Sequence, residues 1–184
     1  MKLFQFGCSV SLGEEATTCY GEILAEKHNL EFIQLSESSA SNPHIALKFC
    51  ETQKHITSKD IVVFGWSHPN RNSWYNKYTG NWEHLNYIQQ KKMGSINTAS
   101  SREYVVHQLC DYIEDLHNWY PKQIVENACK LQGIKYIQVD CVPGMVDILM
   151  VEKSKYIADH LHPNDEGHRY IAGLIGAEFT RRLR

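Results

Sequence analysis

The stretch DIVVFGW, residues 60–66, is the most strand-like run of the sequence and decides the fold class. It is rich in β-branched and aromatic side chains, and no polar residue interrupts it between Ile61 and Phe64. Strands of a parallel sheet are covered by helices on both faces and are therefore almost continuously apolar, whereas strands with one wet face alternate. The stretch therefore predicts a buried strand of a parallel α/β sheet.

Runs with strand and helix character alternate on both sides of this stretch. Further strands are predicted over 2–6, 31–35 and 135–139. Apolar spacing and capping signals predict five helices. The first three cover 14–28, a segment that starts at Asn42 and Pro43, and about 105–116. The fourth runs from Pro121 to Gly133, with Ile124, Ala128 and Leu131 at helical spacing, and the fifth covers about 164–182, with Ile171, Leu174, Ile175 and Phe179 facing inward. This alternation predicts a three-layer α/β/α sandwich with a mainly parallel sheet.

The segment from Ser67 to Ser101 does not follow this alternation. It contains many Asn, Tyr and Trp residues and shows no clear helical or strand period. With 184 residues and 42% hydrophobic content, the chain is long enough for one domain with a sizeable core and short for two. We therefore expect a single domain over 1–184 with an insertion or lid at about 67–101.

The charge balance and the cysteine pattern exclude several classes of protein. Nineteen Lys and Arg residues against 21 Asp and Glu residues give a formal net charge of −2, so we expect no nucleic-acid or anionic-membrane partner. No apolar run is long enough to span a bilayer, and polar residues interrupt the first run, unlike a signal peptide. The six cysteines show no paired spacing and are expected to be free thiols in a reducing compartment, so a cytoplasmic location is predicted.

Ligand sites of open parallel sheets lie beyond the carboxyl ends of the strands. This rule selects the loops at 7–13, 36–42 and 65–73. Ser9 in the first loop follows a strand and the flexible Gly7, and it precedes a predicted helix whose N-terminus carries partial positive charge. Its hydroxyl is therefore a candidate nucleophile. The alternative is an ordinary serine at the start of a helix.

The stretch ADHLHPNDEGHRYIAG, residues 158–173, leads into the last predicted helix. His162 is the candidate base for Ser9, with Asp159 holding its other ring nitrogen, because a catalytic triad depends on spatial roles and not on chain order. The alternative is a polar capping cluster before the helix, and His168 is predicted to be structural. The histidines also raise the question of zinc, but there is no HExxH arrangement and no cysteine nearby, so we predict no metal site.

Two blocks of the sequence together resemble a known superfamily. The first is GCSVS, residues 7–11, and the second is DHLHPN followed by GH within residues 159–168. This combination is similar to the SGNH (GDSL-like) hydrolase superfamily and spans the chain in order. The resemblance implies a flavodoxin-like three-layer fold, hydrolysis of esters including acetyl groups on carbohydrates, a catalytic triad of Ser9, His162 and Asp159, and no cofactor.

The two middle blocks depart from the pattern of this superfamily. Ser39 stands at the position of its oxyanion-hole glycine, and the residues GWSH at 65–68 replace its G-x-N-D block, so that Ser67 replaces the asparagine. The resemblance therefore implies an oxyanion hole made of the Ser9 and Ser39 N–H groups with Ser67. Loss of one oxyanion donor raises the barrier by roughly 3 kcal/mol. The alternative to an esterase is therefore a catalytically weak or inactive binding module with the SGNH fold.

Three residues in the loops at the carboxyl ends of the strands are predicted to bind substrate. They are Asn42, Trp66 and Arg71, and Arg71 also offers a cation in place of the lost asparagine. The other aromatic residues of the insertion are predicted to pack on one another, with stacking on a sugar or acyl group as the alternative. The substrate is expected to be a small-molecule or carbohydrate ester. The GCS block is also similar to that of divergent phage-encoded proteins.

Overall fold

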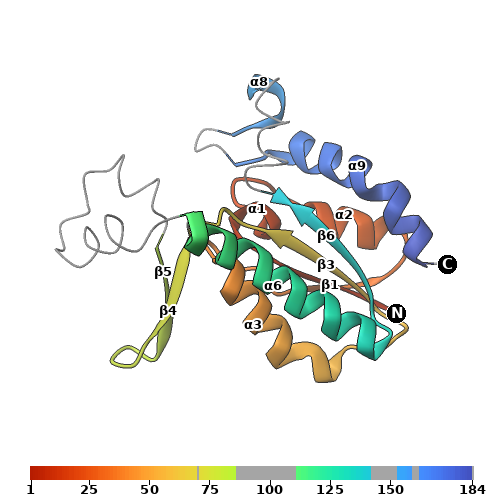
Figure 1. Cartoon of the computed structure of the whole chain (residues 1–184). Helices are drawn as coiled ribbons and strands as arrows, with labels where there is room; N and C mark the ends of the chain where they lie inside the picture. Colours follow the sequence, from red (N-terminus) through yellow and green to blue (C-terminus); the bar gives the residue numbers. More distant parts are fainter. Residues whose placement is uncertain (70, 86–110, 142–152, 159–161, 184) are drawn as a thin grey trace.

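The computed structural model describes residues 1–69, 71–85, 111–141, 153–158 and 162–183 (Figure 1). Its elements in chain order are β1 (Lys2–Gly7), α1 (Ser9–Leu12), α2 (Tyr20–Lys27), β2 (Glu31–Gln34), α3 (Asn42–Thr52), η1 (Gln53–His55), β3 (Ile61–Trp66), β4 (Asn72–Asn76), β5 (Asn81–Leu85), α6 (Asp111–Gln132), β6 (Lys135–Asp140), α8 (Lys153–Tyr156) and α9 (Asp165–Leu183). The four segments predicted as strands are β1, β2, β3 and β6, and their ends differ from the prediction by at most one residue.

These four strands form one parallel sheet with the order β2-β1-β3-β6. β1 pairs with β2 on one side and with β3 on the other, and β3 also pairs with β6. Gly7 at the end of β1 lies opposite Gly65 of β3. The DIVVFGW stretch thus supplies an inner strand, and the carboxyl ends of the parallel strands meet at one edge of the sheet.

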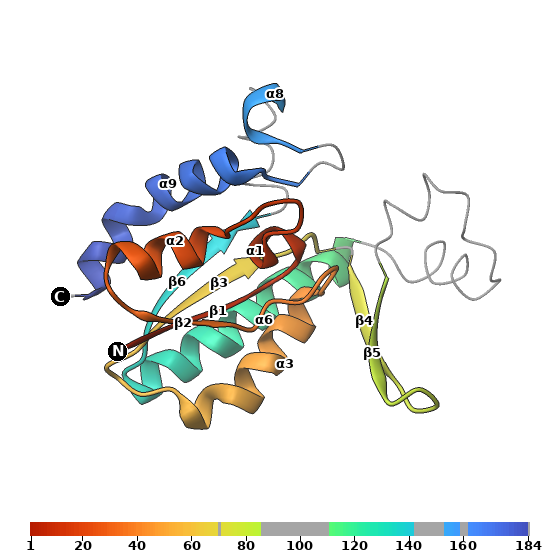
Figure 2. The ribbon, with the colours of Figure 1, turned by 180° about the vertical axis from the view of Figure 1, so that it is seen from behind.

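Helices cover both faces of the sheet, which gives the predicted three-layer α/β/α sandwich (Figures 1 and 2). α2 and α9 lie on one face, and α3 and α6 lie on the other. Ile61 and Val63 of β3 join the core beneath α2 and α9. Val62, Phe64 and Trp66 join the core beneath α3 and α6. Every residue of β3 is buried, which explains the continuous apolar run.

The first helical region differs from the single helix predicted over 14–28. α1 ends before Gly13, which adopts a left-handed conformation (φ 85°), and α2 begins only at Tyr20. A distant element holds the turn between them: the N–H and the hydroxyl of Thr17 donate to the two carboxylate oxygens of Asp165, each at 2.7 Å. Periodicity along the chain contains no information about such a contact, so the prediction merged this turn with the helix.

α6 runs through Pro121, where the sequence predicted the start of a second helix. Its buried stripe is formed by Pro121, Val125 and Cys129, which are one helical turn apart. Ile124 and Leu131, on which the prediction relied, are 48% and 88% exposed. The apolar residues of this part of the helix therefore outnumber its buried positions, and the spacing of Ile124 and Leu131 predicts the helix but does not mark its buried face.

The helices α3 and α9 begin within one residue of the predicted positions. α3 begins at Asn42, but its cap is the Ser41 hydroxyl, which accepts from the N–H of His44. Three of the four apolar residues of α9 that were predicted to face inward are buried, whereas Leu174 is 47% exposed. None of the described helices is long and apolar enough to cross a membrane.

The predicted insertion begins with a β-hairpin. β4 and β5 pair in antiparallel fashion and form a sheet separate from the main one, from which they project (Figure 1). The N–H of Ser41 donates to the Ser73 hydroxyl at 3.1 Å and ties the hairpin to the start of α3. The remainder of the predicted insertion, residues 86–101, lies outside the described residues.

Candidate functional site

Two glycines at the carboxyl ends of β1 and β3 allow the first loop to lie close to the sheet. A Cβ atom on Gly65 would come within 1.9 Å of the Ser11 hydroxyl oxygen, and one on Gly7 within 2.2 Å of the same atom. Ser11 is fully buried, and its hydroxyl lies 2.8 Å from that of Tyr20. Ser11 is therefore a packing residue, which leaves Ser9 as the candidate nucleophile of this loop.

Ser9 is the first residue of α1 and is 2% exposed. The preceding Cys8 is extended, and the N–H groups in the first turn of a helix have no acceptor within the helix. The carbonyl of Ser9 accepts from the N–H groups of Gly13 (3.1 Å) and Glu14 (3.2 Å). The turn after α1 is thereby folded back against the residue proposed as nucleophile.

Two hydrogen bonds, one to the backbone of His162 and one to the side chain of Asn164, position His162 just before α9. The carbonyl of His162 accepts from the N–H of Ala158 at 2.8 Å. Asn164 caps α9, because its side-chain oxygen accepts from the N–H of Gly167 at 2.9 Å. Asp159, the predicted partner of His162, lies outside the described residues.

The imidazole of His162 lies between two carboxylates of the turn after α1. Its Nε2 is 3.3 Å from Glu14 Oε2, and its Nδ1 is 3.4 Å from Glu15 Oε2. The two predicted catalytic loops, from opposite ends of the chain, therefore meet. His162 Nδ1 has no hydrogen-bond partner among the described residues, and no hydrogen bond joins the ring to Ser9. Sequence reasoning placed both glutamates in a helix and did not predict their contact with His162. Their position shortly after Ser9 was the one sequence signal for it.

The two serines predicted for the oxyanion hole lie in the loops after β2 and β3. Ser39 has a left-handed backbone (φ 59°), which glycine adopts at lower cost. Ser67 is 2% exposed, and its hydroxyl has no hydrogen-bond partner in the described part of the chain. Its N–H donates to Asn42 Oδ1 at 2.7 Å, and Asn42 Nδ2 donates to its carbonyl at 3.0 Å. Of the polar groups of Ser67, the hydroxyl is thus the one left as a donor.

The three residues predicted to bind substrate are all buried. Asn42 has no exposed surface and is engaged with the backbone as described. Trp66 stacks on Phe64 with 5.5 Å between ring centroids, and its Nε1 donates to the side chain of Gln138 at 2.8 Å, so the ring belongs to the core. Arg71 is 8% exposed, and its Nη1 has no hydrogen-bond partner among the residues that the structure describes. Within the described structure, Arg71 is the one of the three that retains an unpaired donor.

His168 lies on α9 behind the Ser9 loop and has no exposed surface. Its ring is stacked on that of Tyr20 with 6.1 Å between centroids, and neither ring nitrogen has a hydrogen-bond partner in the described part of the chain. Burial lowers the pKa of His168 to about 4, because the loss of water around the charged form outweighs the opposing attraction of Asp165. His168 is therefore a neutral packing group at neutral pH.

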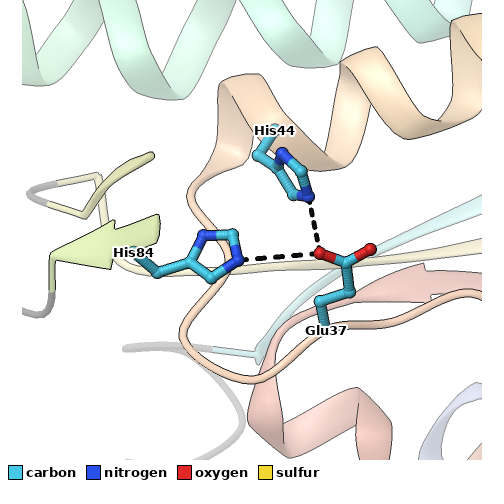
Figure 3. Close-up of side chains that lie close together, drawn as sticks. All are labelled: Glu37, His44 and His84. Carbon is cyan, nitrogen blue, oxygen red and sulfur yellow. Dashed lines mark hydrogen bonds and ion pairs between the residues drawn. The ribbon is translucent and has the colours of Figure 1, made fainter. Parts of the chain in front are cut away.

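A second group of polar side chains lies where the loop after β2, α3 and the hairpin meet (Figure 3). Glu37 Oε2 is 2.8 Å from His44 Nε2 and 3.6 Å from His84 Nε2, and Glu37 Oε1 is 2.5 Å from Lys48 Nζ. Burial by itself would raise the pKa of Glu37, but the hydrogen bonds from Lys48 and His44 outweigh it and lower the pKa. Glu37 is therefore a carboxylate at neutral pH.

The imidazole of His84 in this group also contacts a serine. His84 Nδ1 is 2.7 Å from the Ser73 hydroxyl, and the two residues lie opposite each other in the hairpin register. Burial, and after it the neighbouring His44, lowers the pKa of His84, so the ring is neutral at neutral pH. No sequence motif predicted this group. The hairpin register and the β2–α3 loop bring its residues together, and their spacing along the chain follows no fixed pattern.

Comparisons with known proteins identify the fold. No protein-family model matches the sequence, and no curated protein matches it. A member of the lipolytic protein G-D-S-L family from Veillonella parvula has a similar structure, with a TM-score of 0.51 and 16% identity over 98% of this chain and 99% of that chain. An active-site mutant of a family two carbohydrate esterase from Clostridium thermocellum gives a TM-score of 0.47 at 15% identity, over 99% of this chain and 64% of that chain. A GDSL-like lipase from Bacteroides thetaiotaomicron gives 0.44 at 14% identity, over 99% and 89%. The first similarity shows the α/β/α fold that the sequence resemblance predicted.

Proposed function

We propose that the chain is a serine hydrolase that cleaves an ester, with Ser9 as nucleophile and His162 as general base. The meeting of the two loops carries this proposal: the His162 ring contacts Glu14, whose N–H donates to the carbonyl of Ser9. Ser9 and His162 belong to the two blocks on which the resemblance to SGNH hydrolases rests. The fold shared with a lipolytic G-D-S-L protein supports the same conclusion.

The proposed reaction proceeds through an acyl-enzyme. His162 removes the proton of the Ser9 hydroxyl while Oγ attacks the carbonyl carbon of the ester, and the tetrahedral intermediate expels the alcohol, which takes the proton from the imidazolium. Water then attacks the acyl group with His162 again as base, and the acid is released as the proton returns to Ser9. These steps require no cofactor.

Three donors are proposed to stabilise the oxyanion of the tetrahedral intermediate. They are the N–H of Ser9, which opens α1, the N–H of Ser39 and the hydroxyl of Ser67. The Ser67 hydroxyl is buried without a partner, so it can donate without breaking an existing hydrogen bond. The left-handed backbone of Ser39 fits a position at which SGNH hydrolases have glycine. A preorganised donor of this kind lowers the barrier by roughly 3 kcal/mol.

The two glutamates around His162 have different consequences for this mechanism. Glu15 lies at Nδ1, the nitrogen for which the resemblance implies Asp159, so it favours the same ring orientation. Glu14 lies at Nε2, the nitrogen that must face Ser9. The Glu14 side chain is 30% exposed, and we propose that it rotates toward solvent when substrate binds. Catalytic hydrogen bonds are often absent or long in a free enzyme and form in the complex.

The proposed substrate is a small-molecule ester or an O-acyl group on a carbohydrate. Arg71 supports a polar substrate, because its buried Nη1 has no partner of its own. The proposal includes one domain over 1–184 with an insertion at about 67–101. That insertion starts at Ser67, so it adjoins the proposed oxyanion hole.

Labelling with a fluorophosphonate tests the proposal. The folded wild-type protein should gain one phosphonyl group on Ser9, located by peptide mass spectrometry. Ser9→Ala should abolish the labelling, and His162→Ala should slow it by about a hundredfold or more, because the base no longer activates the hydroxyl. Ser38→Ala is the matched control: it changes an exposed serine of the β2–α3 loop and should label like the wild type.

Two results would reject the proposed enzyme. Labelling that persists in Ser9→Ala would move the nucleophile elsewhere. Complete absence of labelling in protein whose circular dichroism shows native structure would favour a binding module with this fold. If Ser9 is labelled, relative hydrolysis rates of p-nitrophenyl acetate and of longer acyl esters will identify the acyl group.

A further inference from the structure

We propose that Glu37, His44 and His84 form a binding site for a divalent transition metal ion of the zinc class. The three residues come from the β2–α3 loop, from the first turn of α3 and from β5. One carboxylate oxygen and two imidazole nitrogens point toward one another (Figure 3). The proposal does not depend on the proposed hydrolase function, because it concerns binding of the metal alone.

The distances between the donor atoms fit a zinc site. Glu37 Oε2 lies 2.8 Å from His44 Nε2 and 3.6 Å from His84 Nε2, and all three donors lie within 4.8 Å of one another. A tetrahedral zinc ion with bonds of about 2.0–2.2 Å separates its ligand atoms by about 3.3–3.5 Å. Small side-chain rotations therefore convert the observed spacing into that of three ligands, with a fourth position left for water.

The chemistry of the donors selects the kind of metal. Two imidazoles and one carboxylate are a donor set that suits zinc, which is a borderline-soft ion. Mg²⁺ and Ca²⁺ instead require several oxygen ligands. Lys48 binds the other oxygen of Glu37 at 2.5 Å, so Glu37 offers one oxygen and the local negative charge is small. A hard cation therefore gains little at this site, and an imidazole-binding ion is favoured.

A hydrogen bond behind His84 supports the same role. The Ser73 hydroxyl lies 2.7 Å from His84 Nδ1, and its oxygen has two lone pairs, of which one accepts from the N–H of Ser41 at 3.1 Å. If the second lone pair accepts from Nδ1–H, the lone pair of His84 Nε2 faces Glu37. A partner that fixes the tautomer in this way is typical of metal-binding histidines, and a cation between Nε2 and the carboxylate removes their repulsion.

His44 supplies a rigid second imidazole. It is 4% exposed and is packed against the rings of Trp82 and His84, with centroid distances of 4.6 and 4.9 Å. Its Nε2 faces Glu37 Oε2, and its Nδ1 has no hydrogen-bond partner in the described structure. The ion would replace the proton between Nε2 and the carboxylate, the ring would carry its proton on Nδ1, and the Nε2 lone pair would bind the ion. Metal binding would therefore fasten the hairpin to the start of α3.

Titration with Co²⁺, a spectroscopic substitute for zinc, tests the proposal on the full chain. The wild type should bind one ion with the visible absorption of a tetrahedral nitrogen and oxygen site, and Zn²⁺ should displace it. Thiolate ligation by the free cysteines would instead give an ultraviolet sulfur-to-metal charge-transfer band. His84→Ala and Glu37→Gln should each weaken binding by at least about tenfold, and Ser73→Ala should weaken it by about tenfold through loss of the supporting hydrogen bond.

The controls separate this site from the rest of the molecule. His55→Ala removes an exposed histidine and should leave the affinity unchanged, and His162→Ala should do the same although it disables the proposed hydrolase. Circular dichroism of each variant verifies folding, and Zn²⁺ should raise the melting temperature of the wild type but not of Glu37→Gln. Binding that is absent from the folded wild type, that is unchanged in both His84→Ala and Glu37→Gln, or that Mg²⁺ reproduces would overturn the proposal.

Discussion

Two regions of the molecule bring a segment that contains a serine together with a histidine, and they differ in how that histidine is bonded. In the Ser9 region, formed by Ser9, Glu14, Glu15 and His162, the ring lies against two carboxylates and makes no hydrogen bond to the serine. In the Glu37 region, formed by Glu37, His44, Ser73 and His84, a direct 2.7 Å contact joins Ser73 to His84. Sequence blocks identify the first region, and contacts alone identify the second.

Under the two proposals made above, the short Ser73–His84 contact supports a cation site and does not mark a nucleophile. In the Glu37 region, His84 is joined to Ser73 through Nδ1, and its Nε2 and that of His44 surround one carboxylate oxygen, which is a donor set for a cation. The Ser67 hydroxyl, which follows the neighbouring strand β3, is buried without a partner among the described residues. Unpaired donors are costly in a folded protein and are expected where charge develops during a reaction.

Replacing each serine by alanine gives the largest expected difference between the two regions. Ser9→Ala should lower kcat/KM for p-nitrophenyl acetate by about a thousandfold or more, because loss of the nucleophile leaves only binding and oxyanion stabilisation. Ser73→Ala should lose far less, since its hydroxyl supports His84. The measurement is a steady-state rate on folded variants, and the reverse ranking would exchange the roles assigned to the two regions.

The fold could be predicted from the sequence because burial on both faces leaves a signal within one short segment. The run Ile61–Trp66 is apolar throughout for that reason, whereas the other three parallel strands were predicted from shorter, only partly apolar runs. The turn at Thr17 and the phase of α6 could not be predicted, since they depend on contacts with distant elements. Thr17 is held by Asp165, and the buried stripe of α6 is formed by Pro121, Val125 and Cys129.

The candidate site could be predicted only where chemistry is concentrated in a continuous block. Ser9 and His162 stand in such blocks, whereas Glu15 reaches His162 through the folding of a turn. Along the chain, Glu37 and His84 are separated by α3, β3 and most of the hairpin. The register of β4 with β5 determines where His84 lies relative to Glu37. No spacing rule along the chain contains that information.

The Ser67 hydroxyl provides the next largest test. Ser67→Ala should lower kcat by about a hundredfold with little change in KM, because an oxyanion donor acts in the transition state and not on the bound substrate. The free energy of unfolding should change by less than about 1 kcal/mol, since the hydroxyl has no partner to lose. A variant with wild-type kcat would remove Ser67 from the oxyanion hole and leave the Ser9 region with backbone donors alone.

The two regions also differ in the treatment of a buried histidine, and this predicts a pH effect on stability. His44 contacts a carboxylate, whereas His168, which packs on Tyr20, has no hydrogen-bond partner among the described residues, and its pKa is about 4 against about 6.5 in an unfolded chain. Between these values the unfolded state binds the proton and the folded state does not, so stability falls as the pH falls from 6.5 to 4. The expected loss from His168 is about 3 kcal/mol.

Urea denaturation at several pH values measures this loss. His168→Phe removes the titrating group while it keeps an aromatic ring against Tyr20, so its stability should fall less steeply than that of the wild type over the same pH range. The comparison of slopes is independent of any constant change in packing, and Asp165 and His162, whose charges act on the ring, are present in both proteins. Parallel slopes in the two proteins would show that His168 is protonated in the folded state.

The smallest expected effect concerns Glu14 and distinguishes a blocked base from an oriented one. Glu14 lies at the ring nitrogen that the mechanism assigns to Ser9, and its side chain is 30% exposed. A partly exposed ion pair is worth about 0.2–1 kcal/mol, so Glu14→Gln should raise kcat/KM by up to about fivefold, because the contact no longer has to be broken. Glu15→Gln is the matched control at the opposite nitrogen and should lower the rate, since it removes a group that orients the ring. If Glu14→Gln instead lowers the rate as much as Glu15→Gln does, both carboxylates hold the imidazole in its working position. His162 would then have to reach Ser9 by a movement of the whole loop and not by rotation of the Glu14 side chain.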